Sequence, residues 1–130
     1  NYLNNSLFDN YNKNNHDSNK FKCKLLFYIN LSILEIINVK TIVDILLKYQ
    51  DMLVINIRLE NNNQICEDLS DYIYIIYTNI SNIIKFNNIY TEEYNNIYSN
   101  IEFVSQLKNK SYPSINNKII FKYKDLYDLL

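Results

Sequence analysis

The chain has 130 residues but no glycine, no alanine and no tryptophan, and it contains a single proline. A chain without glycine cannot form a Gly-rich phosphate loop, a dinucleotide-binding turn or a G-x-S-x-G nucleophile elbow. Each of these needs a backbone conformation or a close approach that a Cβ atom blocks. Three large classes of enzyme are therefore excluded.

Cysteine and histidine are too few to form a recognisable metal or nucleophile pattern. Cys23 and Cys66 lie far apart with no C-x-x-C spacing, which favours free buried thiols over a disulfide. His16 is the only histidine, whereas a zinc site or a catalytic pair needs more ligands or partners. Asn30 and Glu35 interrupt the best apolar run, so no membrane span is expected. Free thiols favour a reducing compartment, so a cytosolic or nuclear location is the default, and a cytoplasmic one is predicted.

Asparagine, isoleucine and tyrosine dominate instead, with 24, 21 and 13 residues. Their codons are AT-rich, so the bias is typical of an AT-rich genome and individual Asn and Tyr residues carry little information. Residues 1–19 are rich in Asn and poor in apolar residues, which predicts a flexible segment, with a short docked helical turn as the alternative. Residues 20–130 predict one domain, and the lack of an initial Met predicts a fragment.

From Lys20 onward the apolar residues recur with a helical period. The first helix should end near Asn38, which would take the left-handed cap conformation in place of glycine. Its predicted inner face contains Leu26, Ile29, Ile33, Ile36 and Ile37. Thr41 should cap a second helix, with Asp44 completing a T-x-x-D capping box. This helix should stop before Asn61, and its inner face contains Val43, Leu46, Leu47 and Met52 or Leu53.

The third helix is the most regular, with apolar residues at steps of four and three: Ile65, Leu69, Ile73, Ile76, Ile80 and Ile83. Segment 72–77 alternates like a strand, but the helical pattern is longer and is preferred. Thr91 should cap a fourth helix with Glu92 and Glu93 in its first turn and Lys108 and Lys110 in its last. The inner face of this helix contains Tyr94, Ile97, Ile101 and Val104. Ser114 should cap a fifth helix, with an inner face of Ile115, Ile119, Tyr123, Leu126 and Leu130.

Five such helices joined by short turns predict an all-α fold. Antiparallel helical pairs stacked as a HEAT-like repeat, or α-solenoid, are favoured over a closed bundle. Charge is unevenly distributed, because residues 41–107 carry three basic and nine acidic side chains, while 108–124 carry five lysines and no acid. Opposite ends of a stack are therefore expected to present opposite charge.

The C-terminal segment reads Ile-Asn-Asn-Lys-Ile-Ile-Phe-Lys-Tyr-Lys-Asp-Leu-Tyr-Asp-Leu-Leu. It resembles the last repeat of the middle domain of eukaryotic translation initiation factor 4-gamma. Lys118 stands where that family has a basic residue, and the other matching positions are Ile115, Ile119, Phe121, Asp125, Asp128 and Leu129. Segments 34–41 and 69–76 resemble earlier parts of the domain, so the likeness spans residues 21–130. The chain departs from the family in ending at Leu130, where an Arg is usual.

The resemblance implies a non-catalytic scaffold that needs no cofactor and takes no small-molecule substrate. It implies a DEAD-box RNA helicase of the initiation factor 4A type as the partner, held in an active, half-closed arrangement, with mRNA as a further partner. The alternative is a helical-repeat adaptor elsewhere in mRNA metabolism, such as a poly(A)-binding-protein partner or a protein of nonsense decay, splicing or cap binding.

The resemblance also selects candidate contact residues in the C-terminal region. A basic strip with neighbouring carboxylates is expected to meet the helicase or RNA, and its members are Lys108, Lys110, Lys118, Lys122, Lys124, Asp125 and Asp128. The competing interpretations are a solvated lysine-rich face and, for the two aspartates, salt bridges or helix caps. Glu67, Asp68 and Asp71 are interpreted as a solvated acidic face.

Overall fold

The computed structural model describes residues 18–130, and within this range every regular element is helical. The elements are α2 (Ser18–Ile33), α3 (Val39–Asn56), α4 (Asn63–Lys85), the short 3₁₀ helix η2 (Asn88–Tyr90), α5 (Thr91–Ser105) and α6 (Asn117–Asp128). The all-α prediction is confirmed for this part of the chain. The predictions made for residues 1–17, including the lone His16, lie outside the described residues.

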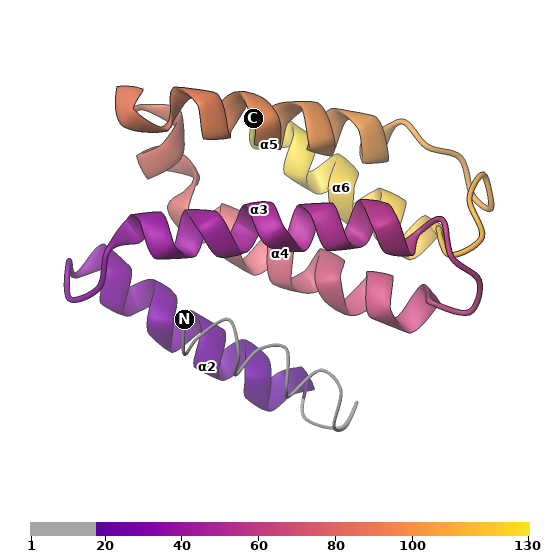
Figure 1. Ribbon diagram of the computed structural model, residues 1–130, viewed down its shortest axis with the longest axis horizontal. Coiled ribbons are helices and arrows are strands. Elements are labelled where there is room, and N and C mark those ends of the chain that lie inside the picture. Colours follow the sequence, from indigo (N-terminus) through magenta and orange to yellow (C-terminus); the bar gives the residue numbers. More distant parts are fainter. Residues whose placement is uncertain (1–17) are drawn as a thin grey trace.

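Helix α4 is the centre of the fold, because it packs against α2, α3, α5 and α6. Consecutive helices run antiparallel, and α3 and α5 lie in front of α4 and α6 in Figure 1. The contacts α2·α4, α4·α6 and α3·α5 join alternate helices of the chain. The described helices therefore form two layers, one of α2, α4 and α6 and the other of α3 and α5.

The long stripe of isoleucines explains why α4 can be central. Leu69, Ile73, Ile76 and Ile80 are buried as predicted, and neighbouring tyrosines Tyr72 and Tyr77 are buried beside them. β-branched residues are poor helix formers, but burying each large apolar side chain contributes about 1.5–3 kcal/mol, which exceeds the small propensity cost. The helix prediction for segment 72–77 is therefore confirmed over the strand alternative.

The predicted inner face of the first helix is only partly confirmed: Ile29 is buried, and Ile37 packs against the core from beyond the helix end. Leu26 and Ile33 are exposed, and Ile36 lies beyond the end of the helix, whereas the buried residues of α2 are Phe21, Leu25, Ile29 and Ser32. The Ser32 hydroxyl is satisfied by donating to the Ile29 carbonyl at 2.6 Å. The helix stops at Ile33, so Ile36 and Ile37, which helped to define the predicted face, are not part of it. The buried face includes Leu25 and Ser32, each one residue before a predicted position.

The turn between α2 and α3 uses different residues from those predicted. Glu35, not Asn38, takes the left-handed conformation, with a φ of 63°. The Glu35 N–H donates to the Ser32 carbonyl at 3.1 Å, and the Ile36 N–H donates to the Leu31 carbonyl at 2.9 Å, which is the Schellman pattern. Asn38 instead caps α3, because its side-chain oxygen accepts the Lys40 N–H at 2.9 Å.

The start of α3 corrects the predicted capping box. Helix α3 begins at Val39, so Thr41 is already inside its first turn and the T-x-x-D pair does not form the cap. The helix ends at Asn56, before Asn61 as expected. Val43, Leu46 and Leu53 are buried, while Leu47 and Met52 are half-buried.

The ends of α5 and α6 also differ from prediction, although their inner faces agree. Glu92 and Glu93 lie in the first turn of α5, but the helix ends at Ser105, so Lys108 and Lys110 lie in the following loop. The side chain of Asn116 caps α6 by accepting the Ile119 N–H at 3.1 Å. The buried residues on these two helices include the predicted Ile97, Ile101, Val104, Ile119, Tyr123 and Leu126.

Ser114 has a role that the capping prediction missed. Its side chain is fully buried, and its hydroxyl donates to the Leu59 carbonyl and accepts the Asn62 N–H at 2.9 Å. The Ser114 N–H also donates to the Ile57 carbonyl at 2.9 Å. The loop between α5 and α6 is therefore fixed to the turn between α3 and α4, at the right-hand end of Figure 1.

Candidate partner-binding surface

Two of the predicted contact lysines on α6 face the neighbouring helix α4. The Lys122 ammonium lies 3.5 Å from the Asp71 carboxylate and 4.7 Å from the centre of the Tyr74 ring. The Lys118 ammonium lies 4.0 Å from Glu67, although its side chain remains mostly exposed. Lys122 is thus engaged within the molecule, while Lys118 is free to contact a partner as well.

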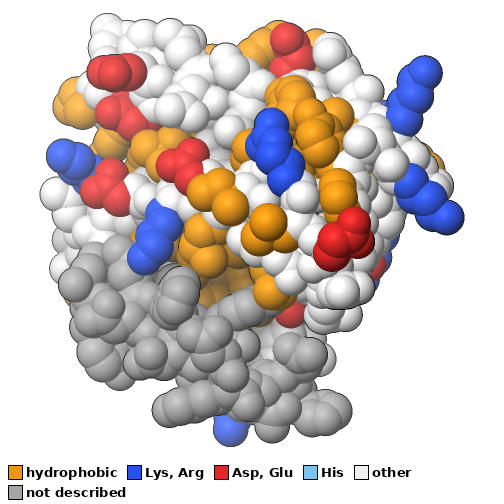
Figure 2. Space-filling model, turned by 45° about the vertical axis from the view of Figure 1, so that its right-hand side comes forward, with side chains coloured by type: hydrophobic (Ala, Val, Ile, Leu, Met, Phe, Trp, Pro, Cys, Tyr) orange, Lys and Arg blue, Asp and Glu red, His pale blue; other side chains and the backbone are white. Residues whose placement is uncertain are grey.

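Asp71 connects three helices of one layer. In addition to Lys122 of α6, it accepts a hydrogen bond from Lys22 of α2 at 3.1 Å. Glu67 accepts one from the Asn116 side chain at 3.3 Å. The acidic middle of the chain and the basic C-terminal region therefore meet in the structure instead of forming separate fields. Figure 2 agrees, because acidic and basic side chains are interspersed on the face it shows.

Asp68 completes the acidic group on α4, and it is buried rather than solvated. Its side chain is only 7% exposed, and the Gln64 amide donates to its carboxylate at 3.0 Å. Burial raises the pKa of Asp68, and the nearby charges of Asp71 and Glu67 add to this effect, while Gln64 and Lys22 oppose it. The three carboxylates expected to form a solvated acidic face are therefore paired or buried.

Lys124 points away from the other two α6 lysines. Residues two apart on an α-helix are separated by roughly 160° around its axis, so Lys122 and Lys124 lie on nearly opposite sides. Lys124 lies 5.6 Å from the centre of the Phe121 ring. It borders an open pocket of about 400 Å³, whose other lining residues are Ser105, Gln106, Tyr127 and Asp128. The three lysines consequently do not form a single strip.

The two predicted aspartates lie on the solvent side of α6. Asp125 and Asp128 are exposed, and neither has an ion-pair partner within residues 18–130, so the expected salt bridges are not formed there. Phe121 is 57% exposed and precedes them by one and two helical turns. Phe121, Asp125 and Asp128 together make a surface that we call the outer face of α6.

Lys108 and Lys110 lie in the fixed loop that precedes α6. Lys110 has a φ of 63°, a conformation that usually selects glycine. Close to the loop, the Arg58 guanidinium lies 5.2 Å from the centre of the Tyr112 ring. Lys108 and Lys110 are exposed on a loop whose position is set by Ser114.

The pairing of α4 with α6 has a sequence signal that was not among the predictions. Glu67 and Asp71 are four residues apart on one helix, and Lys118 and Lys122 are four residues apart on another. Equal spacing places both charges of each helix on one side, so neighbouring helices of the same direction bring them together in register. The matched spacing predicts these ion pairs only when α4 and α6 are already known to be neighbours.

The candidate metal ligands among the described residues are acidic side chains and cysteines. Within 18–130 no three His, Cys, Asp or Glu residues gather in a way that could hold a metal ion. Cys66 is buried as expected, and burial raises its pKa to about 12, whereas Cys23 is exposed, contrary to the expectation of two buried thiols. No helix in this range has the length and apolar character needed to cross a membrane.

Comparison with known proteins gives no relative for this chain: no protein-family model, curated protein or solved structure matches it.

Proposed function

We propose that this chain is part of a cytoplasmic, non-catalytic helical-repeat scaffold of the initiation factor 4-gamma middle-domain type. In this proposal its partner is a DEAD-box RNA helicase of the initiation factor 4A type, and mRNA is a second partner. The two-layer packing of antiparallel helices in residues 18–130 supports a HEAT-like repeat, because such repeats stack neighbouring helical pairs in this way.

The observation that carries the proposal is the outer face of α6. Of the positions that resemble the family, Ile115 and Ile119 are buried and explained by the core. Phe121, Asp125 and Asp128 are exposed on one side of the helix, where Lys124 lies beside the Phe121 ring but neither aspartate has an ion-pair partner within residues 18–130. An aromatic ring beside unpaired carboxylates suits a protein partner with a complementary basic surface.

A scaffold of this kind activates a helicase by shifting its conformational equilibrium. A rigid surface that makes more contacts with the half-closed arrangement of the helicase lobes than with the open one favours the former by that difference in binding free energy. The exposed Lys108 and Lys110 would add contacts to mRNA phosphates, and these contacts would weaken as salt rises.

Binding and ATPase assays with purified initiation factor 4A and the full-length protein test the proposal. Changing Asp125 and Asp128 to Lys should weaken binding at least tenfold and lower the stimulation of ATPase activity, because two partner cations would meet like charge. The matched control changes Asp44 and Asp51 to Lys, two exposed aspartates on α3.

Each result of these assays is informative. Equal loss in both double variants would show a general charge effect and contradict the assignment to α6. Wild-type binding without ATPase stimulation would favour the adaptor alternative, and the absence of any binding would exclude the helicase as partner.

A further inference from the structure

A second surface lies at the opposite end of the helices from the loop that precedes α6. There the turn between α2 and α3 faces the segment that joins α4 to α5, and the two enclose a pocket of about 520 Å³. Pockets of roughly 300–1,000 Å³ are typical of ligand sites. Its apolar lining includes Ile33, Val39 and Ile83.

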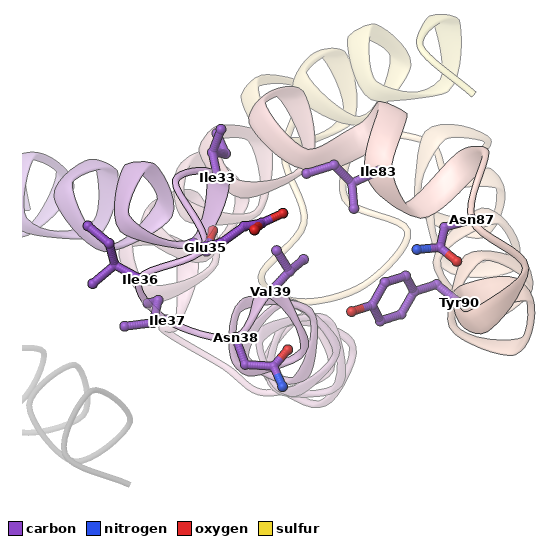
Figure 3. Close-up of a pocket in the computed structure, with 10 residues that line it drawn as sticks. Ile33, Glu35, Ile36, Ile37, Asn38, Val39, Ile83, Asn87 and Tyr90 are labelled. Atoms are coloured by element: carbon purple, nitrogen blue, oxygen red, sulfur yellow. The ribbon is translucent and has the colours of Figure 1, made fainter.

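Polar side chains line this pocket together with the apolar ones, and three of them matter for binding. Figure 3 shows the Glu35 carboxylate directed toward the space between Val39 and Ile83, while Tyr90 reaches toward the start of α3 from the opposite side. Neither Glu35 nor Tyr90 has a side-chain hydrogen bond or ion pair with the described residues. The Asn87 oxygen is occupied, since it accepts the Ile89 N–H at 3.1 Å, so the Asn87 amide keeps both of its N–H donors.

The charge of the pocket is one-sided. Glu35 is the only charged residue in its lining, and no lysine or arginine lines it among residues 18–130. Glu35 is exposed, and the Lys85 ammonium lies outside the lining, 5.8 Å from the centre of the Phe86 ring, so a partner cation gains a modest attraction from Glu35. The free donors of Asn87 suit a carbonyl oxygen, such as that of a peptide backbone.

The rim around the pocket is strongly apolar. Leu34 and Ile36 on one turn are 69% and 65% exposed, and Phe86 and Ile89 on the other are 77% and 78% exposed. These four side chains, called the apolar rim below, belong to the two segments that border the pocket. Large apolar side chains this exposed beside a concavity are typical of a protein-binding site. A small molecule held inside the pocket would leave this rim in water, whereas a peptide would cover it.

We infer that this end of the molecule, formed by Glu35, Asn87, Tyr90 and the apolar rim, binds a short apolar segment of a partner protein that carries one Lys or Arg. The apolar side chains of the segment cover the rim, its cation pairs with Glu35, and a backbone carbonyl accepts from Asn87. This site is independent of the helicase contact proposed for α6, so each can fail alone.

Selection from a phage-displayed library of random linear peptides on the immobilised chain tests the inference. We expect enriched peptides with Lys or Arg among Leu, Ile, Phe or Met. Synthetic copies should bind the Glu35→Lys variant roughly three- to fivefold more weakly, because an exposed ion pair is lost and like charge replaces it. The Phe86→Ser variant should weaken them as well.

Glu60→Lys is the matched control, because Glu60 is an exposed glutamate in the turn at the other end of the molecule. This change should leave peptide affinity unaltered, and circular dichroism should show that all three variants remain folded. No enrichment, enriched peptides without a basic residue, or equal binding to the Glu35→Lys variant would each overturn the inference. Binding to phosphatidylserine vesicles that Phe86→Ser abolishes, with no peptide enriched, would identify a membrane contact and overturn it too.

Discussion

Asp68 is a carboxylate held inside the protein near the start of α4. It is 7% exposed, and burial is the main cause of its raised pKa. A carboxyl group with a raised pKa in the folded state binds its proton more tightly there than in the unfolded chain. This tighter proton binding stabilises the folded state fully below the unfolded pKa of about 3.9, and the stabilisation is lost as the pH rises through the higher folded pKa.

We accordingly expect the Asp68→Asn variant to be more stable than the wild type at pH 7 and nearly equal to it at about pH 3.5. Asn keeps an oxygen that can accept from Gln64, so the hydrogen bond at 3.0 Å is preserved. Urea unfolding at the two pH values measures the difference in the free energy of unfolding. The exposed Asp51→Asn is the control, and a less stable Asp68→Asn at pH 7 would contradict the argument.

At the level of single residues, the sequence identified the core better than the surface. Ile73, Ile76 and Tyr123 could be assigned to the interior because a helical period fixes which side of a helix is apolar. Lys122 and Lys124 could not be assigned to their surroundings, because charged side chains follow no such period. Their environments depend on which helices become neighbours.

Among the elements, the turn between α2 and α3 stores backbone strain at Glu35. A non-glycine residue in the left-handed region costs roughly 1–2 kcal/mol, and the Schellman hydrogen bonds hold Glu35 in this conformation. We expect Glu35→Gly to stabilise the protein by about 0.5–1 kcal/mol, since part of the relieved strain is offset by the greater backbone entropy of glycine in the unfolded chain.

Thermal or urea unfolding would measure this gain. Leu34→Gly is the matched control, because Leu34 is the preceding residue in the same turn and does not have a positive φ. It should destabilise the protein by up to about 1 kcal/mol. Loss of stability in both variants would show that the φ of 63° at Glu35 does not carry the expected strain.

Helix ends were less predictable than helix interiors, and the reason is physical. Asn suits both an N-cap and a left-handed C-cap, so in a chain without glycine the same residue type signals the start and the end of a helix. Asn38 was predicted to end one helix and instead begins the next. Ser114 was predicted to cap a helix, but its hydroxyl satisfies two backbone groups of a distant turn, which no local pattern could show.

For the molecule as a whole, the helical class and the antiparallel order followed from the sequence, while the layers did not. An apolar stripe shows that a helix has a buried side but not which helices cover it. The buried surface of α4, which includes Cys66, Tyr72 and Tyr77 beside the isoleucine stripe, is wider than the single stripe that the sequence predicted. Contact with four other helices is what requires so wide a surface.

This arrangement predicts that stability is unevenly distributed. Within the described residues α2 packs mainly against α3 and α4, and Phe27 on its outer side is 58% exposed, whereas α4 is covered by four helices. In such a stack the helix with the fewest packed neighbours opens at the lowest free energy. Amide hydrogen exchange of the intact chain should therefore be faster in α2 than in α4.

Two core substitutions make this prediction specific. Leu25→Ala removes a fully buried side chain of α2 at a cost of about 2–5 kcal/mol, and it should accelerate exchange in α2 more than tenfold with little change in α4. Ile76→Ala makes a cavity of similar size in α4 and should accelerate exchange in every helix, since all of them lose a shared support. Equal acceleration of α4 by both substitutions would mean that the helices unfold as one cooperative unit, and α2 could then not open separately from the rest.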